Sequence, residues 1–146
     1  MKINGKHIIN ATPKVVWKMI LDPRVLEKIT PGIKTLEEKE TDIYKAVSEV
    51  RVGPVRGAFE GELAIIDKVT EESCTVALDQ KSKMGNAKAE ISMKLIPTED
   101  GKTEIQYTGD VRMSGMLARM GQRIIGGVVS TLSKQFFTAL ENEIEN

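Results

Sequence analysis

His7 and Cys74 are the only histidine and the only cysteine of this 146-residue chain. A Ser-His-Asp or Cys-His constellation would therefore have to use His7. Strand parity places His7 with Ile3 and Ile9, which is typical of a core or rim histidine. Cys74 falls on the side of Val76, and we interpret it as a small buried hydrophobe rather than a nucleophile. We expect no catalytic residue in this chain.

Metal and phosphate chemistry lack their usual sequence patterns here. One histidine and one cysteine cannot form an ordinary zinc site, and no Asp-x-Asp-x-Asp loop for calcium occurs. The segment 53–61 is rich in glycine, but it has no Gly-Lys-Ser/Thr ending and does not open onto a helix. We therefore expect neither a metal site nor a cofactor.

Binding is the chemistry that the remaining polar residues allow. Ser48, Gln80, Ser82 and Tyr107 each have apolar neighbours of the same strand parity. Such groups orient ligands inside apolar pockets, or they are rim residues whose hydrogen bonds go to the backbone. Both interpretations stay open at this stage.

Methionines gather toward the end of the chain. The chain has seven of them, and five cluster in the last strands and at the start of the last helix, namely Met84, Met93, Met113, Met116 and Met120. Methionine adapts to irregular apolar ligands, and it is also an ordinary filler of cores. The cluster is compatible with either role.

Two long predicted strands have one apolar face on which several residues are glycine or alanine, and we call such a face hollow because its small side chains leave space. Their opposite faces carry polar residues such as Glu60 and Lys88. The hollow faces consist of Gly53, Val55, Gly57, Phe59, Gly61, Leu63 and Ile65, and of Gly85, Ala87, Ala89, Ile91, Met93 and Leu95. Small residues on a buried face leave room for a closely packed helix, for bending of the sheet, or for a ligand.

The elements that must position these residues follow from periodicity and turn signals. Thr12 and Pro13 start a first short helix, and Pro23 opens a second. A long helix is predicted from Met116 to Ile144, with Ser114 as its cap. Its buried face must wind or the helix must bend, and a bend would come most easily at Gly126–Gly127. Strands are predicted at residues 1–9, 33–38, 43–52, 55–69, 74–81, 84–96 and 103–113.

The buried ridge of the long helix is expected to consist of residues spaced mostly by four, namely Leu117, Met120, Ile124, Val128, Leu132, Phe136, Leu140 and Ile144. The fold class is therefore α+β, a seven-stranded curved antiparallel sheet around a long C-terminal helix, with two short helices after the first strand. We expect one domain over residues 1–146.

Composition narrows the partners and the compartment. Lys+Arg and Asp+Glu number 21 each, so no basic excess indicates nucleic acid. The chain contains no run of about 18 apolar residues, which is the length that a helix needs to span a bilayer. With no signal peptide and a single cysteine, we expect a cytoplasmic protein.

The order of several short segments resembles a known family. The opening is similar to that of the polyketide cyclase/START-like (SRPBCC, Bet v1-like) superfamily, and the closer match is to the CoxG family of carbon monoxide dehydrogenase subunits. The residues that carry this likeness are 11–17 (ATPKVVW), Leu21-Asp22-Pro23, Thr30-Pro31-Gly32, 52–55 (VGPV), 59–61 (FEG), 115–125 (GMLARMGQRII) and Gln135-Phe136-Phe137.

The resemblance implies a helix-grip fold with an internal apolar cavity between sheet and helix. It also implies service to a molybdenum hydroxylase of the carbon monoxide dehydrogenase type, through membrane recruitment, maturation, or carriage of a hydrophobic molecule such as a quinone. Ile33 stands where the family often has cysteine, and the stretch Met84–Ala87 is poorer in glycine. Because the chain lacks the membrane tail of some members, we expect at most transient membrane contact.

We therefore expect an intracellular, non-enzymatic protein that holds a quinone or lipid-like molecule. The alternatives are an assembly or membrane-recruitment module for that enzyme without ligand carriage, and a cyclase or hydrolase. The expected cavity wall consists of Val55, Gly57, Phe59, Leu63, Leu78, Ile91, Met93, Tyr107, Met113, Met116, Met120, Ile124 and Val128.

The entrance to this cavity is expected between the first half of the long helix and the loops around Pro31-Gly32 and Met84-Gly85. A sealed pocket cannot exchange a bulky ligand without a moving part, and glycine-containing loops move most easily. Met84, Met116 and Met120 would then form a lip that could rest on a membrane surface.

Overall fold

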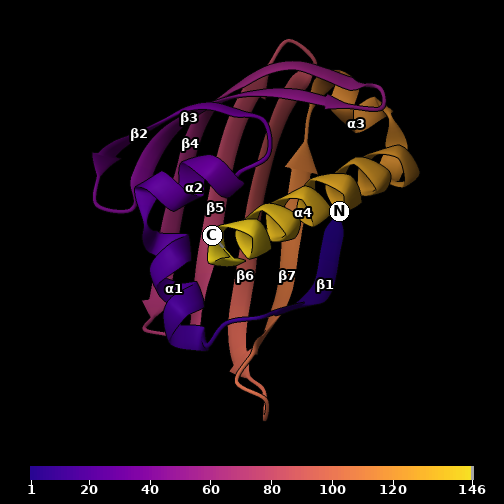
Figure 1. The fold of residues 1–146 in the computed structure, drawn as a ribbon. Helices are drawn as coiled ribbons and strands as arrows, with labels where there is room; N and C mark the ends of the chain where they lie inside the picture. Colours follow the sequence, from indigo (N-terminus) through magenta and orange to yellow (C-terminus); the bar gives the residue numbers. More distant parts are fainter. Residues whose placement is uncertain (146) are drawn as a thin grey trace.

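The computed structural model describes residues 1–145 and contains seven strands and four helices (Figure 1). The strands are β1 (Lys2–Ile9), β2 (Ile33–Glu40), β3 (Ile43–Val52), β4 (Val55–Val69), β5 (Ser73–Ser82), β6 (Gly85–Pro97) and β7 (Thr103–Met113). The helices are α1 (Pro13–Leu21), α2 (Pro23–Ile29), α3 (Gly115–Arg119) and α4 (Gly121–Glu145). The predicted fold class is confirmed.

All strands form one antiparallel sheet in the order β1-β7-β6-β5-β4-β3-β2. Strands β2 to β7 each pair with their neighbours in the chain, because short turns connect them. The first strand instead pairs with the last, and α1 and α2 carry the chain across to the other edge. The sheet curves around α4, which crosses its concave face, and α1 and α2 lie at one end (Figure 1).

Local sequence signals set the two short helices. The Thr12 hydroxyl accepts a hydrogen bond from the Val15 N–H at 3.4 Å, and Pro13 occupies the first turn of α1. Asp22 ends α1 and caps α2, where its carboxylate accepts from the Arg24 N–H at 2.9 Å. That backbone hydrogen bond is the main reason why the pKa of Asp22 lies below its usual value.

The strand alternation agrees with the sequence prediction. In β4 the side chains of Val55, Phe59 and Leu63 are buried, and the intervening Glu60 is exposed. In β6 the alternation continues, with Met93 buried and Lys88 exposed. The hollow apolar faces of both strands therefore face α4, as their pattern predicts.

The C-terminal helix departs from its prediction. The helix continues through Gly126–Gly127, and the chain breaks instead at Met120–Gly121, where Gly121 adopts φ 84°. A ridge of residues spaced by four drifts around a helix of 3.6 residues per turn. The break between α3 and α4 changes which residues of the following helix face the sheet. As a result Ile125 is buried, whereas the predicted ridge residue Ile124 is 44% exposed.

Ser114 stands at the N-cap position of α3, but its hydroxyl makes no capping hydrogen bond there. It accepts instead from the backbone N–H of Asn86 at 3.0 Å, and the Ser114 N–H donates to the Asn86 carbonyl at 3.0 Å. The start of α3 is therefore fixed to the β5–β6 hairpin, which places this short helix over the sheet.

Two groups of buried apolar side chains hold the layers together. The larger group joins α1, α2 and the second half of α4 to the sheet, with Trp17, Ile29 and Leu140 among its members. The smaller group lies where α3 and the start of α4 meet β4, with Phe59 and Leu117 among its members. Apolar burial of this kind is the main favourable contribution to folding.

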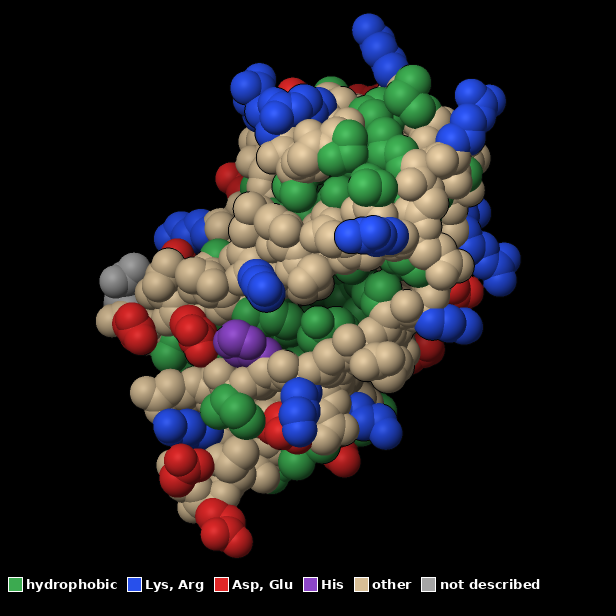
Figure 2. Space-filling model, turned by 90° about the vertical axis from the view of Figure 1, so that its right-hand side faces the viewer, with side chains coloured by type: hydrophobic (Ala, Val, Ile, Leu, Met, Phe, Trp, Pro, Cys, Tyr) green, Lys and Arg blue, Asp and Glu red, His purple; other side chains and the backbone are tan. Residues whose placement is uncertain are grey.

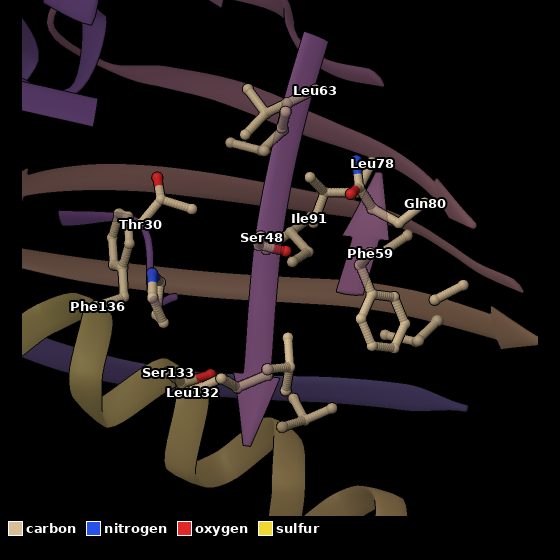
Figure 3. A pocket seen from close by; sticks show the side chains of 18 of the residues that line it. Thr30, Ser48, Phe59, Leu63, Leu78, Gln80, Ile91, Leu132, Ser133 and Phe136 are labelled. Atoms are coloured by element: carbon tan, nitrogen blue, oxygen red, sulfur yellow. The ribbon is translucent and has the colours of Figure 1, made fainter. Parts of the chain in front are cut away.

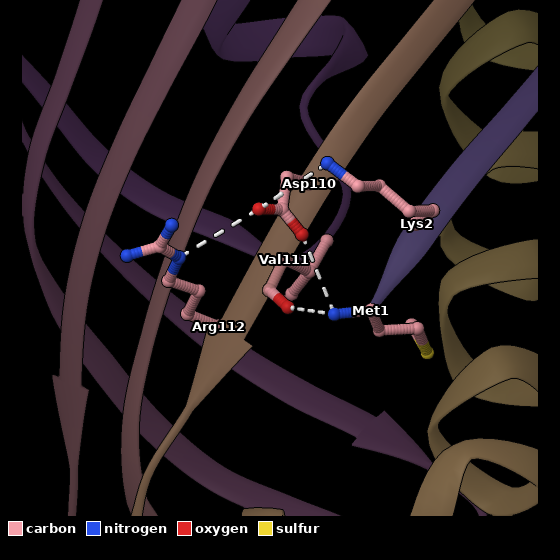
Figure 4. A network of polar contacts seen from close by, with 5 residues as sticks. All are labelled: Met1, Lys2, Asp110, Val111 and Arg112. Carbon is pink, nitrogen blue, oxygen red and sulfur yellow. Dashed lines mark hydrogen bonds and ion pairs between the residues drawn. The ribbon is translucent and has the colours of Figure 1, made fainter.

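The β1 edge is joined to β7 by charges as well as by the strand ladder (Figure 4). The Asp110 carboxylate lies 3.4 Å from the Met1 ammonium, 3.7 Å from Lys2 Nζ and 3.6 Å from Arg112 Nε. The Met1 ammonium also donates to the Val111 carbonyl at 2.7 Å. Desolvation opposes ionisation of Asp110, yet these positive charges outweigh it and lower its pKa.

Among residues 1–145, none of the helices combines the length and the hydropathy that crossing a bilayer requires.

Candidate functional site

A cavity of about 350 Å³ lies between the concave face of the sheet and α4 (Figure 3). Strands β3 to β7 supply most of its wall, and α2, the following turn and α4 close it. Its size lies within the usual range of ligand pockets, about 300–1,000 Å³. The volume exists because small residues such as Ala87 and Ala89 occupy the wall where larger ones would meet the helix.

The wall is apolar apart from a few polar groups, namely Thr30, Ser48, Gln80, Tyr107 and Ser133. Two of them already bond to the backbone. The Thr30 hydroxyl donates to the Leu26 carbonyl at 2.6 Å, and Gln80 Nε2 donates to the Glu62 carbonyl at 3.2 Å.

The hydroxyls of Ser48, Tyr107 and Ser133 have no such partner within residues 1–145. Figure 3 shows Ser48 and Ser133 on different sides of the hollow, one on the sheet and one on the helix. A ligand that carries separated hydrogen-bonding groups on an apolar body would find a donor or acceptor at each.

Ser82, which has the same sequence pattern as Ser48 and Gln80, has a different role. Its hydroxyl donates to the Gly85 carbonyl at 2.7 Å and accepts from the Met84 N–H at 3.1 Å. These bonds close the β5–β6 hairpin, so for Ser82 the interpretation as a backbone-bonded rim residue is the correct one.

Nine of the predicted wall residues lie on the cavity wall, namely Val55, Phe59, Leu63, Leu78, Ile91, Met93, Tyr107, Met113 and Val128. Strand parity brings the sheet residues together, because every second side chain of each strand faces the helix. That these side chains contact a ligand remains a prediction.

Four predicted wall residues lie elsewhere. Met116 is 53% exposed and Ile124 is 44% exposed, whereas their neighbours Leu117 and Ile125 are buried and line the cavity. Met120 packs beside the smaller apolar group at the break. Gly57 has φ 138° and no atoms near its missing side chain, and it forms no part of the wall.

The sequence reasoning missed the wall residues that come from the helices, the turn after α2 and the edge strand. They include Ile3, Thr30, Pro31, Val129, Ser133 and Phe137. The signal for Ser133 and Phe137 was present, because they follow Ile125 at helical spacing once the phase of α4 is correct. The turn after α2 carries no comparable signal, since its position depends on how α2 packs.

Cys74 is part of the wall and is 4% exposed. Burial raises the pKa of its thiol to about 11, and the positive charge of Lys68 only partly offsets this effect. The thiol is therefore protonated at neutral pH, and a protonated thiol is a poor nucleophile and a poor metal ligand. This result agrees with the interpretation of Cys74 as a small buried hydrophobe.

His7 lies at the rim, where β1 passes beside α4. Its ring stacks on Phe137, with centroids 4.8 Å apart, and its Nε2 lies 3.4 Å from the Glu141 carboxylate. Phe137 in turn faces the cavity. His7 therefore joins the edge strand to the helix that covers the cavity.

The expected entrance beside Met84-Gly85 is closed. The Leu117 N–H donates to the Met84 carbonyl at 3.0 Å, and Gly85 packs against the backbone of Ser114. A groove lies instead between β1 and α4, and it shares Ile3, Tyr107, Val129 and Ser133 with the cavity wall. Figure 2 shows a hollow lined by hydrophobic side chains next to His7, at this side of the molecule.

Within residues 1–145, no three His, Cys, Asp or Glu side chains lie close enough together to hold a metal ion. The chemistry that the wall offers is desolvation of an apolar molecule, with hydroxyl groups for a few hydrogen bonds.

Residues 5–145 match CoxG, a family of carbon monoxide dehydrogenase subunits. The match spans almost the whole chain, so the chain belongs to this family. No protein of curated function matches it in sequence.

Solved structures share the fold over almost the full length. A conserved protein from Geobacillus kaustophilus is 29% identical, with a TM-score of 0.96 over 99% of this chain and 95% of its own. A START superfamily protein from Mycobacterium smegmatis is 12% identical, with a TM-score of 0.76 over 99% and 97% of the two chains.

A more distant likeness concerns an enzyme. The Zhui aromatase/cyclase from Streptomyces sp. R1128 is 12% identical, with a TM-score of 0.73 over 99% of this chain and 93% of its own. At this level of identity the likeness extends to the fold alone, which is START-like.

Proposed function

We propose that this member of the CoxG family binds an apolar small molecule, a quinone or lipid-like compound, between its sheet and α4. The observation that carries the proposal is the cavity of about 350 Å³ with an almost wholly apolar wall. Transfer of apolar surface from water into such a space stabilises a complex by roughly 25 cal/mol per Å² buried. A molecule of low solubility gains most from this exchange.

The polar groups of the wall favour a ligand with isolated acceptors on an apolar body. The hydroxyls of Ser48, Tyr107 and Ser133 can each donate one hydrogen bond to a carbonyl oxygen. A quinone ring carries two carbonyl oxygens on opposite sides, which fits hydroxyls that come from different walls. This fit supports a quinone over a plain hydrocarbon.

A binding role without catalysis is the simplest role for this wall. Among the described residues, the cavity lining includes no Asp, Glu, His, Lys or Arg, so a general acid or base would have to be Cys74 or Tyr107. Burial raises the pKa of the Cys74 thiol to about 11, so this thiol is protonated near neutral pH and is a poor general base there. The wall therefore offers no carboxylate, imidazole or amine for proton transfer.

The name of the family, which is that of a carbon monoxide dehydrogenase subunit, supports an enzyme partner in addition to the ligand. We infer that the protein acts in the cytoplasm and serves a carbon monoxide dehydrogenase-type molybdenum hydroxylase, with the bound molecule as its cargo. The alternative is a module for assembly of that enzyme, in which the cavity stays empty.

Native mass spectrometry of the protein from its own source separates these roles. A co-purifying mass of a quinone or lipid supports the carrier, and a clean protein mass together with failure to bind a short-chain quinone analogue contradicts it. The analogue is measured by displacement of a fluorescent apolar probe.

A matched pair of variants places the site. Ala89→Leu adds three carbons on the cavity face of β6, and Ser92→Leu adds a side chain of the same size on the opposite, exposed face. We expect Ala89→Leu to weaken quinone binding at least about tenfold while changing stability by about 1–3 kcal/mol, and Ser92→Leu to leave binding unchanged. If the folded Ala89→Leu protein bound the quinone analogue as tightly as the natural sequence does, this cavity would be excluded as the binding site.

A further inference from the structure

The groove between β1 and α4 differs in character from the cavity that it adjoins. It has a volume of about 430 Å³, with residues 1–4 on one side and α4 on the other. The wall of the cavity is almost wholly apolar, whereas the groove adds Asn4, Gln122 and Ser130, none of which lines the cavity. The groove is therefore a polar space beside an apolar one.

Strand β1 supplies free backbone groups to this groove, because it is the last strand of the sheet. The Met1 ammonium donates to the Val111 carbonyl at 2.7 Å, and the Val111 N–H donates to the Met1 carbonyl at 2.8 Å. Residues of an antiparallel strand alternate between such bonded pairs and unbonded ones. Ile3 therefore directs its N–H and C=O toward β7, and Lys2 and Asn4 direct theirs away, to the groove.

The helical side of the groove is open because a glycine stands at its centre. Gly126 lines the groove, and a Cβ at this position would have no atom within 4 Å. Gln122 and Ser130 lie four residues before and after it, so the three positions share one face of α4. The space beside Gly126 therefore lies between a side-chain amide and a hydroxyl.

The groove and the cavity meet at four residues that belong to both walls, namely Ile3, Tyr107, Val129 and Ser133. The ring of Tyr107 reaches across its cross-strand partner Gly5, where any larger side chain would collide with its hydroxyl end. The glycine thus lets the Tyr107 hydroxyl lie at the boundary between the two spaces. A molecule whose apolar body fills the cavity can extend its other end into the groove.

The charges near the groove favour an uncharged end group. Its wall contains no Asp or Glu, and its cations are Lys2 and the Met1 ammonium. Both lie near the Asp110 carboxylate, at 3.7 Å and 3.4 Å, so their charge is already paired (Figure 4). Backbone N–H groups donate, carbonyls accept, and serine and glutamine do both. An end group that also donates and accepts, such as a hydroxyl or an amide, matches this set.

We propose that the groove binds the uncharged polar end of the ligand whose apolar body lies in the cavity. The ligand class is an amphiphile with a hydroxyl- or amide-bearing end, of which a monoacylglycerol is a simple example. Its end group bonds to the free backbone groups of Lys2 and Asn4 and to Ser130. A quinone, which only accepts hydrogen bonds, would use the N–H groups alone. This inference rests on the proposed binding function and adds the chemistry of the end group.

Three compounds with the same lauroyl chain test the end group. Monolauroylglycerol carries free hydroxyls, methyl laurate carries none, and laurate is negatively charged. Displacement of a fluorescent apolar probe measures each affinity. We expect monolauroylglycerol to bind at least about tenfold more tightly than methyl laurate, because its hydroxyls form additional hydrogen bonds. Laurate should bind no more tightly than the methyl ester.

Gly126→Leu and Gly127→Leu form a matched pair of variants. Both replace a glycine inside α4 by the same good helix former, and neither position has an atom near its missing side chain. Only Gly126 lines the groove. We expect Gly126→Leu to abolish the preference for monolauroylglycerol over methyl laurate, and Gly127→Leu to leave this preference unchanged.

A second pair removes one outward N–H group from the edge of β1. Asn4 and Lys6 both direct their backbone away from β7, where an edge strand tolerates proline, but only Asn4 lines the groove. Asn4→Pro should lower the affinity for monolauroylglycerol by about three- to tenfold. Lys6→Pro should leave it unchanged, and so should Asn4→Ala, which retains the N–H.

Several results would overturn the inference. Equal affinities of monolauroylglycerol and methyl laurate would contradict it alone, since both compounds would still occupy the cavity. Tightest binding of laurate would assign the groove to an anionic end group instead. A retained preference in folded Gly126→Leu protein would place the end group elsewhere. Failure of all three compounds and of the quinone analogue to bind would overturn the binding function together with this inference.

Discussion

The imidazole ring of His7 lies almost flat against the phenyl ring of Phe137, with centroids 4.8 Å apart and planes 9° from parallel. His7 belongs to the edge strand β1, and Phe137 belongs to α4, where its ring also approaches Tyr107 at 5.6 Å. The pair therefore connects the sheet edge to the helix that covers the cavity. Offset ring pairs of this kind stabilise proteins beyond their burial alone.

A double-mutant cycle measures this connection. We expect His7→Ala and Phe137→Leu to be coupled by about 0.5–1.5 kcal/mol in the free energy of unfolding, because either change removes the same ring contact. Urea unfolding of the two single variants and the double variant gives the coupling. His7→Gln serves as the control, since it retains a polar side chain near Glu141 without a ring, and additive effects of the two substitutions would contradict the prediction.

Two glycines of the C-terminal helical region should respond to alanine in opposite directions. Gly121 has φ 84° at the break between α3 and α4, so Gly121→Ala should lower stability by about 1–2 kcal/mol. Gly126 lies inside α4 with open space where a side chain would stand, so Gly126→Ala should raise stability by about 1 kcal/mol. Thermal unfolding of both variants measures these changes in stability. A stabilised Gly121→Ala protein would contradict the prediction and would mean that α3 and α4 readily join into one helix.

The Cys74 thiol should react slowly with maleimide near neutral pH. Its pKa of about 11 leaves about one thiol in a thousand ionised at pH 8, and the wall of the cavity shields it. Its rate should rise about tenfold per pH unit until the pH approaches this pKa. The control is Ser92→Cys in a Cys74→Ser background, which exposes its thiol on the outer face of β6. Equal rates for the two thiols at pH 7 would show that the interior is open to the reagent.

Asp110 should contribute to acid sensitivity. Its pKa lies below 3.8 in the folded protein, so its ion pairs stabilise the fold above the unfolded-state pKa and are lost as pH falls through the folded-state pKa. Asp110→Asn should therefore be less stable than the natural sequence at pH 6, and the difference should vanish at strongly acidic pH. Urea unfolding across this range tests the prediction, with Glu99→Gln in the β6–β7 turn as the control. A difference that is constant with pH would point to packing instead of charge.

The sheet could be predicted from sequence because its information is local. Alternation of Val55, Phe59 and Leu63 with charged residues fixes which face of β4 is buried, and turn residues fix where each strand stops. Most of the cavity wall follows from that parity. The same reasoning placed Tyr107 and Met113 correctly on the wall from β7.

The helical part of the wall could not be predicted, because its phase is a tertiary property. Nothing near Met120-Gly121 marks the break more strongly than Gly126-Gly127 does. The difference arises because the β5–β6 hairpin holds α3 through the Met84 carbonyl. A shift of one position then exchanges Ile124 for Ile125 on the wall. The groove between β1 and α4 escaped prediction for a similar reason, since it depends on how two distant elements pack.

The pairing of β1 with β7 has a consequence for how the chain acquires its structure. Lys2 pairs with Asp110 and Ile9 with Thr103. Strand β1 leaves the ribosome first, but it cannot pair until β7, the last strand, has been synthesised. Closing such a long loop is slow, and contacts of high sequence separation generally delay folding. Until α4 has been synthesised, the apolar face of the nascent sheet has no cover. Newly made chains therefore pass through a stage in which the surface that later surrounds the cavity is open to chaperones and to aggregation.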